Sequence, residues 1–162
     1  MSFSAAILTV SDMGSRGERE DTSGAAIREM LGSAGIDVSR YEMIPDEREL
    51  ISGRLSKWAD GGGLQLIVTT GGTGLGPRDV TPEATKAVLD YEVPGIAEAM
   101  RLEGLKHTPM SMISRAVAGV RNGVLIVNLP GSPKSVRENL GVVAPVLKHA
   151  LELLAGEQSK HG

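Results

Sequence analysis

Apolar residues gather into four short runs along the chain, and these runs predict β-strands. The runs cover residues 5–10, 41–44, 66–70 and 124–129. They are rich in Leu and β-branched residues and do not alternate cleanly with polar positions, as is typical of strands buried on both faces. The pattern therefore predicts a sheet that is covered by other elements on each side.

Between these runs, apolar positions recur with the period of a helix. They are Ile27, Met30, Leu31 and Ala34 in a first segment, Ile51, Leu55 and Trp58 in a second, and Val136, Leu140, Val143, Leu147, Ala150 and Leu154 in a third. Gly35 and the glycines at 61–63 end the first two helices. Pro145 lies inside the third, 132–155, and predicts a kink or a break into two helices.

The alternation of strands and helices predicts an α/β fold with three layers: a central, mostly parallel sheet with helices on both faces. The length of 162 residues fits one domain, which we expect to cover residues 1–156, followed by a flexible tail at 157–162. Ligands bind beyond the carboxyl ends of the strands in such sheets. The segments after Val10, Ile44, Thr70 and Leu129 are therefore the candidate binding loops.

Composition excludes several classes of function. The chain has no cysteine, which excludes disulfides, zinc–thiolate sites and a thiol nucleophile. A net charge of −3 and only four aromatic residues argue against a nucleic-acid partner. No apolar run approaches the ~20 residues that cross a membrane. We expect a cytoplasmic protein with no membrane contact.

A glycine-rich segment follows Thr70 and reads Gly71-Gly72-Thr73-Gly74. Glycines let backbone N–H groups crowd around an anion, and Thr81-Pro82 reads as the N-cap and first residue of a helix just downstream. The segment matches neither the Walker A motif nor the dinucleotide fingerprint. It predicts either a phosphate-binding loop or a tight turn chosen for close packing.

Two carboxylates also follow predicted strands. Asp46 comes after Ile44 and Asp79 lies in the glycine-rich segment. Each has a simpler interpretation, Asp46 as part of a capping box with Glu49 and Asp79 as a turn carboxylate. As a pair beside a phosphate-binding loop, they are the hard oxygen ligands that suit Mg²⁺ on a phosphate.

Two further segments at strand ends are polar. Residues 130–135 place Ser132 as an N-cap, Pro133 as the first helical residue and Lys134 as a cation at a helix start, either an anion contact or a solvated lysine. Residues 11–24 form a loop that either closes over a ligand or lies free on the surface. No histidine falls in the glycine-rich segments, so the sequence does not support a Ser/His pair.

Three longer motifs, at 69–74, 77–85 and 127–134, and shorter ones at 11–12, 44–47, 92–95 and 114–116, resemble the molybdenum cofactor biosynthesis family. That family includes single-domain bacterial adenylyltransferases and the N-terminal domain of gephyrin. The resemblance covers the chain from about residue 5 to residue 154. It implies a molybdopterin-binding domain that adenylylates molybdopterin with Mg-ATP and releases pyrophosphate.

The resemblance also implies roles for individual residues. The two essential acidic positions, which we expect to be catalytic and to bind Mg²⁺, match Asp46 and Asp79. The nucleotide and phosphate positions match Ser11, Gly71, Gly72, Thr73, Gly74 and Arg78. The molybdopterin-side positions match Ser114, Arg115, Pro130, Gly131, Ser132 and Lys134.

The expected partners are molybdopterin, ATP, two further copies of the chain in a homotrimer, and a molybdenum insertion protein that acts downstream. The apolar segments 96–100 and 110–113 are the candidates for the contacts between subunits, with ordinary core packing as the alternative. The alternative function is a carrier or scaffold of the same fold that binds molybdopterin without catalysis. The presence of both Asp46 and Asp79 favours the enzyme.

Overall fold

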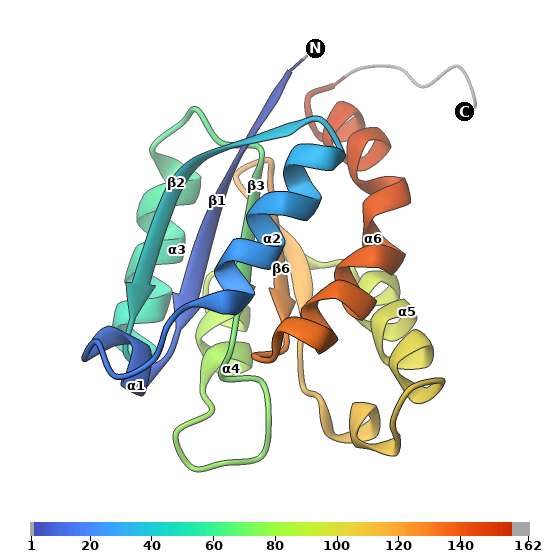
Figure 1. Cartoon of the computed structure of the whole chain (residues 1–162). Coiled ribbons are helices and arrows are strands. Elements are labelled where there is room, and N and C mark those ends of the chain that lie inside the picture. The colour runs from blue at the N-terminus through green and yellow to red at the C-terminus, as the bar shows by residue number, and fades with distance from the viewer. Residues whose placement is uncertain (1, 157–162) are drawn as a thin grey trace.

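The computed structural model describes residues 2–156, which contain one mixed sheet. Its strands are β1 (Phe3–Val10), β2 (Ile36–Ile44), β3 (Leu66–Thr70), β4 (Tyr91–Glu92), β5 (Ala118–Arg121) and β6 (Val124–Leu129), in the order β2-β1-β3-β6-β5-β4 (Figure 1). The four strands β2, β1, β3 and β6 are parallel, and β5 is antiparallel to both of its neighbours. The prediction of a mostly parallel sheet is confirmed.

Helices cover both faces of this sheet. They are α1 (Asp12–Ser15), α2 (Thr22–Ser33), α3 (Arg48–Asp60), α4 (Thr81–Lys86), α5 (Pro94–Leu105), the 3-10 helix η1 (Pro109–Ile113) and α6 (Pro133–Leu154). Helices α2, α5 and α6 pack on one face, and α3 and α4 pack on the other (Figure 1). The predicted three layers are therefore present. The expected tail at 157–162 lies outside the described residues.

Strand β1 shows why the apolar runs lack alternation. Phe3, Ala5 and Ile7 pack into the core beneath α2 and α6, whereas Ala6 and Leu8 pack into the core beneath α3. All five are at most 1% exposed. Because successive side chains of a strand point to opposite faces, both sets are buried only when helices cover each face.

Two predicted features differ from the structure. Helix α6 is one continuous helix, so the predicted break at Pro145 is wrong. Pro145 and Gly141 are both exposed, and water can therefore reach the Gly141 carbonyl that loses its helical donor. Strand β2 begins at Ile36 rather than at residue 41, because this edge strand carries polar residues that hide its first half from an apolar pattern.

Strands β4 and β5 were not predicted from the sequence. Strand β5 joins β6 through Asn122 and Gly123, which both have positive φ, 49° and 77°. An Asn-Gly pair between two short strands is a strong hairpin signal, and it could have found β5. Strand β4 has only two residues, too few for any pattern.

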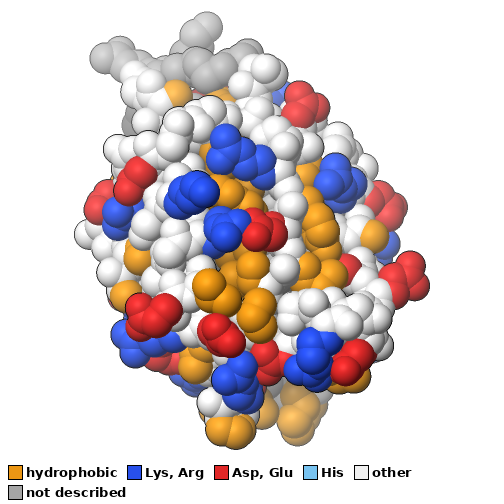
Figure 2. Space-filling model, turned by 90° about the vertical axis from the view of Figure 1, so that its left-hand side faces the viewer, with side chains coloured by type: hydrophobic (Ala, Val, Ile, Leu, Met, Phe, Trp, Pro, Cys, Tyr) orange, Lys and Arg blue, Asp and Glu red, His pale blue; other side chains and the backbone are white. Residues whose placement is uncertain are grey.

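The side of the molecule formed by β2 and α3 is a mixed surface. Figure 2 shows charged side chains of both signs spread between apolar ones on this side. Arg54 of α3 pairs with Glu42 of β2, and its guanidinium lies 6.0 Å from the centre of the Trp58 ring. Charges along an edge strand disfavour pairing with a strand of another molecule.

Among the residues described, no helix combines the length and apolar character needed to span a membrane.

Buried Asn128 ties β6 to β3 and α4. Its amide nitrogen donates to the Thr69 hydroxyl at 2.9 Å and to the Thr85 hydroxyl at 3.1 Å, and its carbonyl accepts from the Val117 backbone at 3.2 Å. Asn128 is 0% exposed. Asn128 therefore holds β6 against β3 and α4 one residue before β6 ends at Leu129.

We expect Asn128→Ala to lower the free energy of unfolding by about 2–3 kcal/mol, because it leaves buried polar groups without a partner. The matched control is Asn139→Ala, which removes one hydrogen bond to the Ser135 carbonyl of 2.7 Å. That control should cost about 1 kcal/mol. Urea unfolding followed by circular dichroism measures both, and an equal loss in the two variants would contradict the role of Asn128.

Candidate active site

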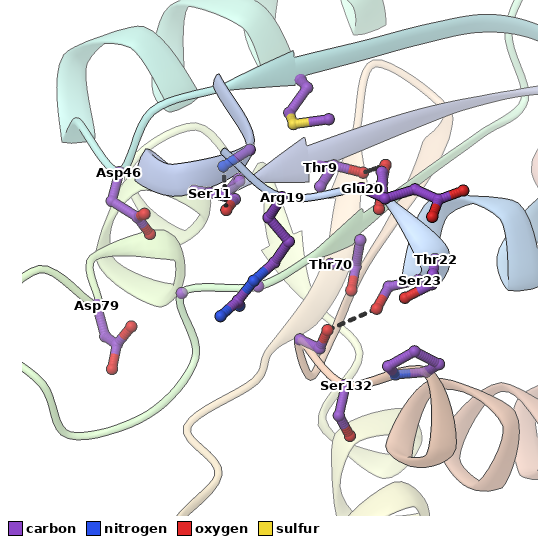
Figure 3. Close-up of a pocket in the computed structure, with 18 residues that line it drawn as sticks. Thr9, Ser11, Arg19, Glu20, Thr22, Ser23, Asp46, Thr70, Asp79 and Ser132 are labelled. Atoms are coloured by element: carbon purple, nitrogen blue, oxygen red, sulfur yellow. Dashed lines mark hydrogen bonds between the residues drawn. The ribbon is translucent and has the colours of Figure 1, made fainter. Parts of the chain in front are cut away.

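The carboxyl ends of the four parallel strands meet at one edge of the sheet. Val10 pairs with Ile44, and Thr70 pairs with Thr9 on one side and Leu129 on the other. A cavity of about 630 Å³ opens at this edge (Figure 3). Seven of the residues expected at the site line it: Ser11, Asp46, Gly71, Gly72, Asp79, Gly131 and Ser132.

The glycine-rich segment passes close to β1, and only glycine fits there. Gly71 has a φ of 99°, and a Cβ on it would lie 2.2 Å from the Val10 carbonyl oxygen. Gly72 has a φ of 70°, and its Cβ would lie 2.3 Å from the hydroxyl of Thr81. Both positions combine a left-handed backbone with no room for a side chain. These two residues form the part of the segment that lines the cavity.

Thr81 holds this turn in place and does not cap α4 as predicted. Its hydroxyl donates to the Gly71 carbonyl at 3.0 Å, and its backbone N–H donates to the Gly72 carbonyl at 3.1 Å. Thr81 is the first residue of α4, and the N-cap is Val80, which makes no side-chain cap. The threonine is completely buried and connects the glycine turn to the helix that follows.

Thr73 and Gly74, two of the expected nucleotide-binding residues, are not among the residues that line the cavity. Both of their carbonyl oxygens accept hydrogen bonds from Arg115. Its backbone N–H donates to the Thr73 carbonyl and its Nε donates to the Gly74 carbonyl, each at 2.8 Å. Arg115 also donates to the Asp79 carbonyl at 2.8 Å and pairs with Glu83. This arginine therefore anchors the glycine-rich segment from outside the cavity.

Asp46 contacts α1 rather than capping α3. One carboxylate oxygen, Oδ2, accepts from the backbone N–H of Asp12 at 2.9 Å. The other, Oδ1, lies beside Gly72, 3.1 Å from where a Cβ would be. The N-cap of α3 is Glu47, without a side-chain cap, so the predicted capping box with Glu49 is wrong.

Asp79 is the turn carboxylate that the simpler interpretation predicted, and it also lines the cavity. Its Oδ2 accepts from the Gly76 backbone at 2.9 Å. Figure 3 shows the carboxylates of Asp46 and Asp79 at the same end of the cavity. The structure therefore brings together the two acidic residues that the sequence singled out.

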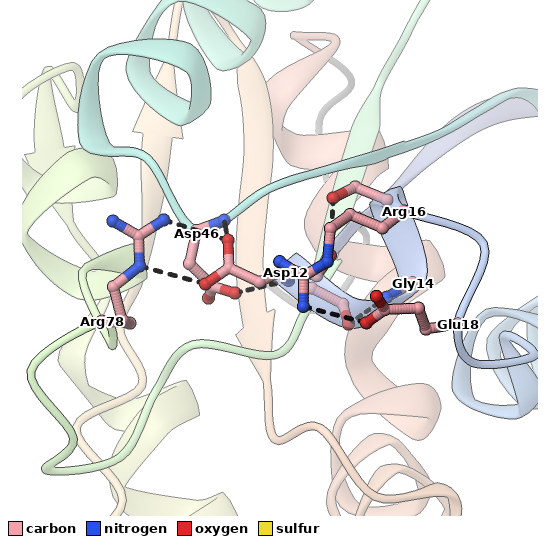
Figure 4. Close-up of polar contacts among 8 residues, drawn as sticks. Asp12, Gly14, Arg16, Glu18, Asp46 and Arg78 are labelled. Carbon is pink, nitrogen blue, oxygen red and sulfur yellow. Dashed lines mark hydrogen bonds and ion pairs between the residues drawn. The ribbon is translucent and has the colours of Figure 1, made fainter.

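Burial and neighbouring charge act in opposite directions on two nearby carboxyls. Burial, with smaller contributions from the charges of Asp12 and Asp79, raises the pKa of Asp46 above its usual range. The guanidinium of Arg78 holds the pKa of Asp12 below its usual range, because it donates to both carboxylate oxygens at 3.0 Å (Figure 4). Arg78 does not line the cavity.

From its middle to the end opposite the two carboxylates, the cavity is lined by residues that were not predicted from the sequence. They are the polar residues Thr9, Arg19, Glu20, Asp21, Thr22, Ser23 and Thr70. Figure 3 shows the Arg19 side chain between the two carboxylates and the hydroxyls of Ser23 and Ser132. Five of these residues belong to the polar segment 11–24, so part of that segment lines the cavity.

Asp21 has a structural role at this end. It accepts from the Gly24 backbone at 2.8 Å as the N-cap of α2, from the Thr9 hydroxyl at 2.7 Å, and from the Tyr41 hydroxyl. Burial, together with the charge and hydrogen bond of Asp21, raises the pKa of Tyr41 to about 12. The three contacts fix the start of α2 against β1 and β2.

Ser114 and Arg115 line a second cavity of about 350 Å³, beside Glu83 and Arg101. Pro130 and Lys134 line neither cavity. The Pro130 carbonyl accepts from the Thr70 hydroxyl at 2.6 Å, and Lys134 is exposed in the first turn of α6. The cap of that helix is Ser132, as predicted, and it accepts from the Ser135 backbone at 3.2 Å.

The side chains at the first cavity that could bind a metal ion fit one kind of metal site. Among residues 2–156, no group of three or more His, Cys, Asp and Glu side chains is arranged to hold a metal ion. Asp46 and Asp79 supply two carboxylates on the wall of one cavity. Mg²⁺ usually binds through one or two carboxylates together with the phosphates of a substrate, so these residues fit that ion.

Comparison with known proteins gives three findings on the relatives of the chain. Residues 6–149 match a protein family described as "Probable molybdopterin binding domain". A molybdopterin adenylyltransferase from Helicobacter pylori J99 is 46% identical over 93% of this chain and 86% of its own length. Gephyrin from Dictyostelium discoideum is 45% identical over 91% of this chain and 22% of its own length.

A solved structure shares the fold closely. The molybdopterin biosynthesis enzyme MoaB from Thermus thermophilus superimposes with a TM-score of 0.90 at 59% identity, covering 98% of this chain and 99% of its own. Sequence and structure therefore agree across nearly the whole length of the described residues. The chain belongs to the molybdenum cofactor biosynthesis family.

Proposed function

We propose that this chain transfers the adenylyl group of ATP to molybdopterin and releases pyrophosphate. The observation that carries the proposal is the placement of Asp46 and Asp79 on one cavity with the Gly71-Gly72 turn, at the carboxyl ends of parallel strands. The relatives named molybdopterin adenylyltransferase support the same reaction. The cavity volume of about 630 Å³ falls in the ~300–1,000 Å³ range of small-molecule sites.

The nucleophile in this reaction is the terminal phosphate of molybdopterin. One of its oxygens forms a bond to the α-phosphorus of ATP, and the bond from that phosphorus to the bridging oxygen of pyrophosphate breaks. A phosphate monoester is already largely ionised near pH 7, since its second pKa is about 6. The reaction therefore needs no general base, and among the described residues neither a His nor a Cys lines the cavity.

Catalysis then depends on alignment and on balancing negative charge. The starts of α2 and α6 both reach the cavity, at Ser23 and Ser132, and a helix start carries partial positive charge that favours an anion. Arg19 adds a full positive charge. We assign the polyphosphate of ATP to these groups and to the Gly71-Gly72 turn. Asp46 and Asp79 would hold Mg²⁺, which neutralises charge on phosphate oxygens when bound.

The remaining expectations on partners stay predictions. Molybdopterin binding by Ser114, Arg115, Pro130, Gly131 and Lys134, a downstream molybdenum insertion protein and a cytoplasmic location belong to them. Ser132, which was expected on the molybdopterin side, is assigned to the polyphosphate of ATP instead. We also propose that residues 1–156 form a single molybdopterin-binding domain. For the homotrimer, an exposed apolar patch on α5 and η1 is the candidate interface: Leu102, Leu105, Met110, Met112 and Ile113, which are 43–69% exposed. In the other expected segment, Met100 is 1% exposed and belongs to the core.

We expect mixing of the protein with molybdopterin and Mg-ATP to release pyrophosphate, and Asp79→Asn to slow that release at least about 100-fold. The variant keeps an acceptor for Gly76 but removes the carboxylate charge. Asp60→Asn is the matched control, because Asp60 is paired with Arg121 on the surface, outside the cavity. A coupled pyrophosphate assay measures all three proteins.

Two outcomes contradict these assignments. Wild-type protein that binds molybdopterin but releases no pyrophosphate would be a carrier, the alternative function. An Asp79→Asn variant that binds Mg-ATP and turns over normally would remove Asp79 from the proposed metal site.

We expect the wild-type chain to sediment as a trimer, and Leu102→Glu/Met112→Glu to sediment as a monomer, because the two added charges fall in the proposed interface. Leu50→Glu is the matched control, since Leu50 is 42% exposed on α3, on the other face of the sheet. Analytical ultracentrifugation at several concentrations measures the mass. A wild-type chain that stays monomeric at all concentrations would contradict the trimer.

A further inference from the structure

Asp12, to which the proposed reaction gives no role, is in contact with both segments that carry the carboxylates of the cavity. Asp12 and Asp46 exchange hydrogen bonds: each backbone N–H donates to the carboxylate of the other residue, at 2.9 Å in both directions (Figure 4). This exchange takes up Oδ2 of Asp46 and leaves its Oδ1 beside Gly72. Contact with Asp12 therefore sets which oxygen of Asp46 faces the glycine turn.

Arg78 makes the second connection. Its Nε and Nη2 donate to the two carboxylate oxygens of Asp12, each at 3.0 Å. A forked pair of this kind fixes the orientation of both partners, which a single hydrogen bond does not. Because Arg78 is the chain neighbour of Asp79, the pair ties the Asp79 segment to α1.

These contacts connect the segments that follow three adjacent strands. Asp12 follows β1, Asp46 follows β2, and Arg78 lies in the segment after β3. The segment after β3 is held on its other side by Arg115, through the carbonyls of Gly74 and Asp79. The part of this segment that lies between its contacts with Arg115 and with Asp12 is mostly exposed, and Leu75 is 66% exposed. The position of this part relative to Asp46 therefore depends on the Asp12–Arg78 pair.

The same contacts engage both carboxylate oxygens of Asp12 within the protein. Oδ1 accepts from Asp46 and Arg78, Oδ2 accepts from Arg78, and the guanidinium balances the carboxylate charge. Arg78 is likewise engaged by Asp12, outside the cavity. The side chain of Arg78 is 60% exposed and that of Asp12 is 26% exposed. Exposed ion pairs add little to the free energy of unfolding. The effect of this pair is on local placement.

We propose that Asp12 is a positioning residue, which fixes the Asp46 and Asp79 segments relative to each other and uses Arg78 as its link to the second. The inference rests on the proposed adenylyl transfer. It assigns Arg78 to a protein contact, where the family resemblance implied a phosphate contact. The two assignments differ in what happens to Arg78→Ala once Asp12 has been removed.

The first test is a double-mutant cycle on pyrophosphate release with Asp12→Ala, Arg78→Ala and the double variant. We expect each single variant to lower kcat about 10–100-fold, as is usual for residues that orient catalytic ligands, and the double variant to be no slower than Asp12→Ala. Asp12→Asn keeps an acceptor for the Asp46 backbone and should lie between wild type and Asp12→Ala. The matched control is Glu18→Ala, which removes the carboxylate of the neighbouring Arg16–Glu18 surface pair and should leave kcat unchanged.

The second test does not depend on turnover. We expect hydrogen–deuterium exchange of the peptide covering residues 71–80 to speed up several-fold, and equally, in Asp12→Ala and Arg78→Ala. Glu18→Ala should exchange like the wild type. The melting temperatures should stay close to that of the wild type, which separates loss of placement from loss of folding.

Three results would overturn the inference. They are an Arg78→Ala loss of kcat that persists in full when Asp12 is already alanine, an Asp12→Ala variant with wild-type kcat, and unchanged exchange of residues 71–80 in both single variants. The first would assign Arg78 to the substrate. If the wild-type protein releases no pyrophosphate, the proposed function fails, and the exchange measurement alone then decides whether Asp12 positions the two segments.

Discussion

The parallel register of β2, β1, β3 and β6 is the constraint on which the rest of the site depends. These four strands run in the same direction, so their carboxyl ends all lie at one edge of the sheet, and the four following segments begin there. Residues 12, 46 and 79 are far apart in sequence, yet each follows one of three adjacent strands. No local interaction could bring them together. The cores on both faces of the sheet maintain this register, because a slip by one residue would turn every buried side chain of a strand to the wrong face.

Close approach of backbone to backbone is the second requirement at this edge. Gly71 sits against the Val10 carbonyl and Gly72 against Thr81, so the turn after β3 reaches the end of β1 with no side chain between them. The buried hydroxyl of Thr81 binds the Gly71 carbonyl of that turn. The buried amide of Asn128 joins β3, which precedes the turn, to α4, which follows it. Glycine at these positions is therefore a packing requirement and a binding feature at once, and the two interpretations of the glycine-rich segment do not exclude each other.

The features that could be predicted from the sequence are those with a local signal. Strands buried on both faces, helix stripes and the Ser132 cap follow from patterns within a few residues. The convergence of Asp46 and Asp79 follows from the rule that loops at the carboxyl ends of parallel strands form the ligand site. The strand predicted at 41–44 was shorter than the edge strand β2, because the polar positions of β2 face solvent. Asp46 satisfies the local rule for a capping box, but the backbone of Asp12, 34 residues away, takes its carboxylate instead. Arg19 lies in a segment with no periodicity, and only the folded chain shows that it reaches the cavity.

Adenylyl transfer to a phosphate places an unusual demand on such a site, because the nucleophile needs no deprotonation at neutral pH. The rate then depends on how well two anionic groups are aligned, and misalignment of about 1 Å can cost about 100-fold. An exposed segment that carries a functional carboxylate must therefore be fixed at both ends. Arg115 holds the backbone of the Asp79 segment from the β5 side, and Arg78 fastens it to Asp12 on the β1 side. In the proposed reaction, these two arginines outside the cavity hold the segment in place, and Arg19, within the cavity, meets the charge of the substrate.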